Sequence, residues 1–312
     1  RCCICWRDYT SSSLGGFEYE NRLMRDREKV FIHTLKQSGA TFGIGDDGVS
    51  VGTYLIANDA FFEDIHFKRA WASLEDLVEK CFLVNLSDIY AMNATPSFLL
   101  LTLSVPDNFK EVSKLAQIIG DCAKKYRIKI IGGDTLVGEK LHFSLTLLGQ
   151  KRQRTLFRKG IKQGNILGYI TPKGALNHAK MQSFGQNLKI LKNSLRFCRD
   201  KKISKYSRFA KPLLYPKMLF ELNNIAKAGM DISDGISLEL SRLSQVNRLG
   251  FKILKQKGDW LYSPEEYQML YAIERRNLKK MQKKAWKFRH QFVPFAVAIR
   301  GKYIAKKQNW HE

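Results

Sequence analysis

The sequence predicts a mixed α+β protein with two domains, on three observations. Short apolar, β-branched segments alternate along the chain with longer segments of helical periodicity. Of the 312 residues, 44% are hydrophobic, which is enough to bury a sizeable core. After Gly149 the composition becomes strongly basic, and 151–165 has the character of a connection. We therefore expect an N-terminal domain over 28–150, a C-terminal domain over 151–312 and an extension over 1–27.

In the first half, the pattern predicts alternating strands and helices. Ser73 and Asp76 form a capping box, and the apolar residues after them recur at helical spacing. A long helix is therefore expected over 73–93. The other expected elements are strands over 53–62, 97–106, 127–134 and 141–149 and an amphipathic helix over 109–126.

The second half repeats this mixture of elements. The apolar run "ILGYITP" at 166–172 predicts a strand, and the lysine-rich segment 263–288 is expected to form one long helix. The remaining expected elements are helices from Gly174 onward, over 216–229 and over 236–250, a strand end over 230–235, and strands over 251–254 and 293–301.

The composition argues against a membrane-spanning protein and against a small fold stabilised by disulfide bonds. No apolar run approaches the roughly 20 residues that a spanning helix needs. The six cysteines match neither a disulfide framework nor zinc-ligand spacing, which indicates a reducing, cytoplasmic compartment. Three of them fall within the first five residues, and Met24 is the first methionine. We expect the folded sequence to begin near Met24.

The net charge of +24 is unevenly distributed along the chain. Residues 1–150 carry 17 Lys and Arg against 19 Asp and Glu, whereas residues 151–312 carry 36 against 10. Such a basic half is compatible with a polyanionic partner such as nucleic acid. A lysine-rich, solvated surface is the favoured interpretation, because most of these lysines follow helical stretches without interleaved aromatic residues.

Several acidic residues lie at the ends of predicted elements or among glycines. The stretch "FGIGDDGV" sets two carboxylates side by side between glycines, an arrangement that a stable core does not need. Each such residue alone is an ordinary turn former or helix cap. Facing one cavity together they would require cations, and Mg²⁺ shared with substrate phosphates suits them, so the pattern indicates metal-assisted phosphoryl transfer. The set comprises Asp46, Asp47, Asp59, Asp88, Asp134, Asp231 and Asp234.

Five motifs in register resemble the thiamine-monophosphate kinase family: "GIGDDGV", "ANDAFFEDIHF", "NLSDIYAM", "IIGGDT" and "DISDG". That family belongs to the superfamily of aminoimidazole ribonucleotide synthetase and selenophosphate synthetase. The resemblance runs from about Glu28 to about Trp310. It implies ATP-dependent phosphorylation of thiamine monophosphate to thiamine diphosphate, by in-line transfer without a phosphoenzyme. It also implies several bound Mg²⁺ ions and a cytoplasmic homodimer in which the N-terminal sheets pair.

The resemblance further implies roles for individual residues. Positions that bind Mg²⁺ fall on Asp47, Asp59, Asp88, Asp134, Asp231 and Asp234, with Ala57 and Asn58 where the family has hydroxyl residues. Positions that contact ATP fall on Gly133, Asp134, Arg158 and Ser233. Positions that bind the acceptor substrate fall on His66, Glu265 and Trp310. No catalytic side chain is implied, because the reaction depends on metal ions and positioning.

The sequence departs from the family pattern in three places. Ala57 and Asn58 remove hydroxyl ligands, Asn93 replaces a glycine, and "SPEEYQ" at 263–268 stands where the family has "GGEDYE". Three alternatives therefore stay open. They are a sister enzyme of the same superfamily, a decayed homologue that binds ATP without turnover, and a basic nucleic-acid-binding protein.

Overall fold

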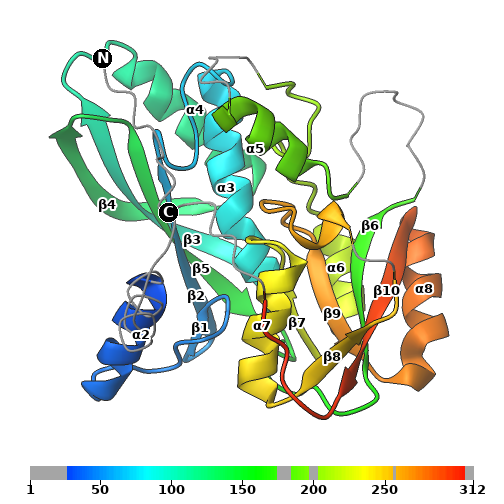
Figure 1. Ribbon diagram of the computed structural model, residues 1–312. Coiled ribbons are helices and arrows are strands. Elements are labelled where there is room, and N and C mark those ends of the chain that lie inside the picture. Colours follow the sequence, from blue (N-terminus) through cyan, green and yellow to red (C-terminus); the bar gives the residue numbers. More distant parts are fainter. Residues whose placement is uncertain (1–26, 174–183, 197–202, 256–257, 306–312) are drawn as a thin grey trace, which may run out of the picture. The chain divides into compact units, whose positions relative to one another are not determined.

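The computed structural model describes residues 27–173, 184–196, 203–255 and 258–305 (Figure 1). The chain divides into two compact units, Arg1–Ile44 and Gly45–Glu312. The described part of the first unit contains helix α2 (Arg27–Gln37). The second unit contains all of the described strands. The predicted boundaries at 28 and 151 stay a prediction.

The predicted mixed α+β class is confirmed by two five-stranded sheets in the second unit. The first sheet has the order β1-β2-β5-β3-β4, and its β3–β4 pair is parallel. The second sheet has the order β7-β9-β6-β10-β8 and is antiparallel throughout. The strands of the first sheet are β1 (Val49–Val51), β2 (Tyr54–Phe62), β3 (Ala94–Pro106), β4 (Lys129–Gly138) and β5 (His142–Lys151). Those of the second are β6 (Ile166–Pro172), β7 (Ala228–Asp231), β8 (Gly250–Ile253), β9 (Met269–Ile273) and β10 (His290–Ile299).

Helix α3 (Leu74–Ala91) packs against elements from both halves of the sequence. It packs on β2, β3 and β5, against α4 (Val112–Lys125), and also contacts β7 and α6 (Pro216–Asn223). Every residue from 80 to 91 is buried. A helix that is buried on all sides offers no solvated face for its polar residues. The polar side chains of α3 must therefore find partners inside the protein.

Helices cover both faces of the second sheet (Figure 1). Helix α7 (Ile236–Asn247) packs its apolar residues with one face of β6 and β9. On the other face, α6 and α8 (Leu278–Lys287) join the larger core, which also contains residues of α3. Strand β9 is buried at every residue. Being covered on both sides explains its continuous apolar sequence.

The expectation of one long helix over 263–288 is wrong. This segment contains strand β9, a short 3-10 turn η2 (Arg275–Asn277) and then α8. Pro264 stands at the start of the segment, and the backbone at Glu265 and Tyr267 is left-handed, which a continuous helix does not allow. The apolar residues of β9 instead pair with β6 and β7.

The remaining expectations that fall within the described residues are confirmed with shifted ends. Strand 166–172 coincides with β6, and the 97–106 and 127–134 strands are longer than expected, at Ala94–Pro106 and Lys129–Gly138. The helix expected over 216–229 ends at Asn223, because the chain then turns into β7. The helix expected from Gly174 begins outside the described residues, and α5 (Asn187–Arg196) follows them. The sequence did not predict β1 or α2.

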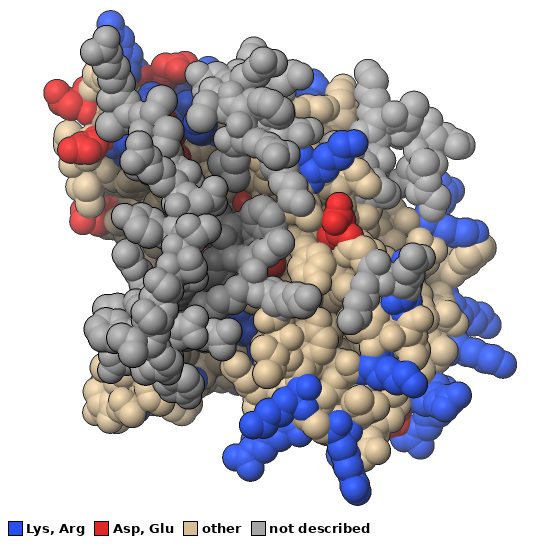
Figure 2. Space-filling model, viewed as in Figure 1, with Lys and Arg blue, Asp and Glu red and all other residues tan. Residues whose placement is uncertain are grey.

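Basic side chains fringe the part of the surface formed by the second sheet and its helices (Figure 2). On α8, Lys279, Lys280, Lys283 and Lys287 are exposed, while Met281 and Ala285 are buried in the core. This arrangement is that of an amphipathic helix with a solvated lysine face. Within the described residues, none of the helices has the length and apolar character needed to cross a bilayer.

The capping box at the start of α3 gives a stability prediction. Ser73 Oγ accepts a hydrogen bond from the Asp76 backbone N–H at 3.2 Å and donates to its carboxylate at 3.0 Å. Ser73→Ala is expected to lower the free energy of unfolding by about 1 kcal/mol, because the N–H loses its acceptor. Urea denaturation checks this. Ser73→Thr, which retains the hydroxyl, should remain close to the parent protein, and equal losses in both variants would contradict the capping role.

Candidate active site

Three carboxylates from distant parts of the chain meet at one point. Asp47 comes from the glycine-flanked turn before β1, Asp88 from α3, and Asp231 from the end of β7. One carboxylate oxygen of each lies within 4.8 Å of the others. Carboxylate oxygens at this separation match the ligand type that Mg²⁺ prefers. The sequence expectation that acidic residues at element ends converge is met for these three.

A fourth carboxylate, Asp59 on β2, adjoins this cluster. Its carboxyl group lies beside that of Asp88, and its backbone N–H donates to Asn85 Oδ1 at 3.0 Å. Both Asn85 and Asp88 lie on the buried part of α3. The helix thus fixes both the position of Asp88 and the strand that carries Asp59.

Burial raises the pKa of every carboxyl group in this set. The pKa of Asp47 rises from 3.8 to about 6, although the charge of Arg158 opposes the shift. The pKa values of Asp59, Asp88 and Asp231 are also raised, by burial first and by repulsion from neighbouring carboxylates second. Asp47 Oδ2 is buried and has no hydrogen-bond partner among the described residues. The cluster therefore favours either protons or a cation.

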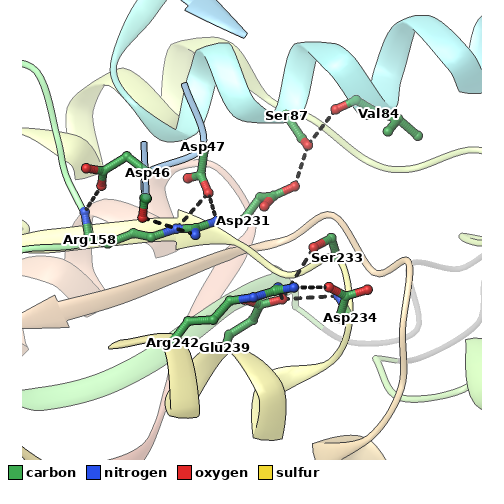
Figure 3. Close-up of polar contacts among 11 residues, drawn as sticks. Asp46, Asp47, Val84, Ser87, Arg158, Asp231, Ser233, Asp234, Glu239 and Arg242 are labelled. Carbon is green, nitrogen blue, oxygen red and sulfur yellow. Dashed lines mark hydrogen bonds and ion pairs between the residues drawn. The ribbon is translucent and has the colours of Figure 1, made fainter. Parts of the chain in front are cut away.

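Arg158 is the counter-ion of Asp47 (Figure 3). Its Nη2 and its Nε, the latter at 3.1 Å, donate to the same carboxylate oxygen. The neighbouring Asp46 accepts the Arg158 backbone N–H at 2.6 Å, and the Gly45 carbonyl accepts from Nη1 at 3.3 Å. The two adjacent carboxylates of the "GDD" turn thus have different roles. Asp46 holds the backbone of Arg158, and Asp47 faces both the guanidinium and the cluster.

A second charged group surrounds the turn of the "DISDG" motif. Glu239 of α7 is fully buried and accepts hydrogen bonds from Ser233 Oγ at 3.3 Å and from the Asp234 backbone N–H at 3.1 Å. Arg242, one helical turn later, donates to Glu239 at 2.8 and 2.9 Å and also pairs with Asp234 (Figure 3). Ser233 and Asp234 were predicted site residues. Their neighbours Glu239 and Arg242 were not.

Ser87 is a further site residue that sequence reasoning missed. Its hydroxyl donates to Asp231 Oδ2 at 2.6 Å, and its Oγ lies 2.7 Å from the Val84 carbonyl oxygen (Figure 3). The signal available in the sequence was its place beside Asp88 in "NLSD". Glu239 and Arg242 offered only an i, i+3 charge pair on a helix, a pattern that is common on solvated surfaces.

Other predicted positions lie in different surroundings. Asp134 is exposed on β4, where its carboxylate accepts the Thr135 N–H at 2.9 Å. The Asn58 amide donates to Thr146 Oγ1 at 2.8 Å on β5, and alternation along β2 directs it away from the face that carries Asp59. Ala57 is buried in the core. Gly133 has φ +148°, and a Cβ there would lie 1.7 Å from the Leu101 carbonyl oxygen.

Of the predicted substrate residues that the structure describes, His66 is half-buried and Glu265 is buried. His66 Nδ1 accepts the Phe62 N–H at 3.0 Å, and its ring centroid lies 5.9 Å from that of Phe61. Glu265 is 4% exposed and pairs with Lys80 at 2.6 Å. Trp310 lies outside the described residues.

Comparisons with known proteins agree with this architecture. Residues 45–150 match the family model described as "AIR synthase related protein, N-terminal domain". The chain is 28% identical to the thiamine-monophosphate kinase of Buchnera aphidicola subsp. Schizaphis graminum over 275 residues, covering 80% of this chain and 82% of the relative. It is 26% identical to that of Bacillus subtilis over 230 residues, 71% of this chain and 70% of the relative.

The resemblance to the thiamine-monophosphate kinases is confirmed. A solved structure described as AaThiL complexed with AMPPCP and TMP aligns with a TM-score of 0.72, 20% identity, and coverage of 90% of this chain and 93% of that one. At this identity the structural match establishes the shared fold. The sheets and helices of the present chain therefore have the architecture of the thiamine-monophosphate kinase fold.

Buried Asp47 gives a pH prediction for the protein without added metal. Because its folded pKa of about 6 exceeds 3.8, the carboxyl group favours the folded state most at low pH, and this contribution is lost as pH rises through about 6. Between pH 4.5 and 7, the parent protein should lose about 2 kcal/mol relative to Asp47→Asn. Denaturation of both proteins in chelator across this range measures it. Parallel stability curves would contradict the expectation.

Proposed function

We propose that this protein is a thiamine-phosphate kinase that transfers the γ-phosphoryl group of ATP to thiamine monophosphate. The observation that carries the proposal is the convergence of Asp47, Asp88 and Asp231, in a chain whose curated relatives are named thiamine-monophosphate kinases. Clustered buried carboxylates are costly for folding and useful for holding cations beside phosphates. A cytoplasmic location accords with the buried free thiols of Cys81 and Cys122.

The donor set of the cluster fits Mg²⁺. Asp47, Asp88 and Asp231 would hold the metal, with Asp59 beside Asp88 and Asp234 at the neighbouring turn. The orphaned oxygen of Asp47 is available for such an ion. Bound Mg²⁺ supplies charge neutralisation for the phosphates and for the transferred phosphoryl group. The metal roles implied for Asp134, Ala57 and Asn58 stay predictions.

The chain's own residues supply positioning and positive charge. Arg158 and Arg242 place two permanently charged guanidinium groups at the edge of the carboxylate cluster, where phosphate oxygens would be bound. The Ser233 hydroxyl lies on the same turn as Asp234. Gly133, the other predicted ATP contact, has to be glycine for a structural reason, because a Cβ there would clash with the Leu101 backbone on β3.

No protein base is needed in the proposed reaction. The acceptor is a phosphate group that is already ionised at neutral pH, so its oxygen attacks the γ-phosphorus without first losing a proton to the enzyme. Direct in-line transfer then leaves ADP and thiamine diphosphate, with no phosphorylated side chain as an intermediate.

Removing a cluster carboxylate should abolish turnover while the protein still folds. Asp231→Asn is expected to reduce kcat by about 100-fold or more, because it removes metal charge and alters the acceptor of the Ser87 hydroxyl. The assay measures thiamine diphosphate formed from ATP, Mg²⁺ and thiamine monophosphate. Circular dichroism and the melting temperature monitor folding.

Asp121→Asn is the matched control, because Asp121 is an exposed carboxylate on α4. It should retain the parent rate. Failure of the parent protein to form thiamine diphosphate would refute the proposed reaction. Near-normal turnover of Asp231→Asn at saturating Mg²⁺ would refute the metal assignment while leaving the reaction intact.

We also propose that the protein is a homodimer that pairs its N-terminal sheets through β4. Among the described strands β4 is at the edge of its sheet, and its residues are exposed along almost its whole length. Ile131 and Val137 are 54% and 72% exposed. An apolar edge strand of this length is a template for pairing with another chain. A second copy of this protein is the partner that we propose.

Charges on β4 should therefore convert a dimer into a monomer. Ile131→Lys combined with Val137→Lys is expected to halve the mass seen by sedimentation velocity, because lysine at an edge opposes strand pairing. Val112→Lys, at a 47% exposed apolar position on α4, is the control and should leave the mass unchanged. A monomeric parent protein at micromolar concentration would contradict this proposal.

A further inference from the structure

A buried ion pair joins α3 to the turn that follows residue 262. Lys80 Nζ lies 2.6 Å from Glu265 Oε2, and the two side chains are only 4% and 5% exposed. The residues are 185 positions apart in the sequence, so the pair exists only in the folded protein. Breaking a buried ion pair by removing one partner leaves an uncompensated charge in the interior. The Lys80 ammonium and the Glu265 carboxylate therefore depend on each other.

The surroundings of Lys80 are aromatic. Its ammonium lies 3.5 Å from the centroid of the Phe209 ring and 5.8 Å from that of Phe61. Burial lowers the pKa of Lys80, and the Glu265 carboxylate opposes this shift. The His66 ring also lies beside Phe61, and the centroids of these two rings are 5.9 Å apart. Two predicted substrate residues therefore belong to one group of neighbours: Glu265 pairs with Lys80, and His66 lies beside Phe61, which in turn lies beside Lys80.

The turn that bears Glu265 has an unusual backbone and several fixing contacts. Glu265 and Tyr267 have φ values of +53° and +48°, which L-residues adopt only when their surroundings hold them there. The Glu265 N–H donates to the Ser233 carbonyl at 2.6 Å, and the Tyr267 N–H donates to the Ile232 carbonyl at 2.8 Å. The backbone of this turn is therefore tied to the strand end between Asp231 and Asp234, while its Glu265 side chain is tied to α3.

Helix α3 relates this pair to the carboxylate cluster. Lys80 and Asp88 are eight residues apart on one continuous helix, so they lie about 12 Å apart along its axis and about 80° apart around it. The acceptor substrate of the proposed reaction has a phosphate at one end and an aromatic amine at the other. With its phosphate at the cluster, its aminopyrimidine end would lie in the region of Glu265.

We propose that Lys80 is a positioning residue for the acceptor substrate: it holds the Glu265 carboxylate where that group accepts a hydrogen bond from the amino group at the far end of the acceptor. This inference rests on the proposed function. Lys80 acts through Glu265 and does not touch the phosphates. Its loss therefore weakens binding of the acceptor and leaves ATP binding intact.

Steady-state kinetics on four proteins test this role: the parent, Lys80→Met, Glu265→Gln and the double variant. Lys80→Met is expected to raise the KM for thiamine monophosphate about tenfold or more, with the KM for ATP changed less than about twofold. In the double variant, the acceptor KM should not exceed that of Glu265→Gln alone, because Lys80 has no carboxylate left to position. Its melting temperature should recover relative to Lys80→Met, since no unpaired buried charge remains.

Lys284→Met is the matched control, because it removes a lysine from another 2.6 Å ion pair, with Glu221. It should change neither KM. If Lys80→Met does not fold, Lys80→Arg makes the same comparison, because it keeps the charge but displaces the carboxylate. An unchanged acceptor KM in the folded Lys80 variant overturns the inference alone, with the pair then only structural. A parent protein that neither binds nor phosphorylates thiamine monophosphate overturns both the proposed function and this inference.

Discussion

Mutual repulsion among buried carboxylates is the constraint on which the arrangement of this protein depends. Asp47, Asp88 and Asp231 approach within 4.8 Å of one another in an interior where charge is poorly solvated. A chain selected for stability alone would separate them or replace them with apolar residues. Their surroundings instead compensate only part of this negative charge. Arg158 pairs with one oxygen of Asp47, and the other oxygen of that carboxylate has no partner in the part of the chain that the structure describes.

Helix α3 makes this concentration of charge possible. Its second half is buried on all sides, so each polar side chain on it is committed to a partner from another element. Ser87 donates to Asp231 on β7, and Lys80 pairs with Glu265 in the turn before β9. The polar groups of α3 thereby hold the end of β7 and the turn before β9 beside the helix that packs on the first sheet. The fold and the site share the same set of contacts.

The sequence predicted the converging acidic residues better than it predicted the cations that compensate their charge. Glycine-flanked and strand-terminal aspartates carry a local signal, because acids are costly at such positions without a cation. The ion pairs around the site carry no local signal, because their partners are distant in the sequence: Arg158 is 111 residues from Asp47, and Lys80 is 185 residues from Glu265. The helix predicted over 263–288 was wrong for a related reason. The apolar residues of β9 fit a buried helix as well as a strand until β6 and β7 are known to flank them.

The choice of counter-ions follows from what each must do. Arg158 and Arg242 keep their charge at every physiological pH and present several donors, so each contacts two acceptors: Asp47 and the Gly45 carbonyl for Arg158, and Asp234 and Glu239 for Arg242. Lys80 is a single ammonium between aromatic rings, which suits one carboxylate in an apolar enclosure. Arginines therefore stand at the cluster, where phosphates would arrive, and the lysine stands at the apolar end. The chemistry of the cations divides the proposed acceptor site into a phosphate end and an organic end.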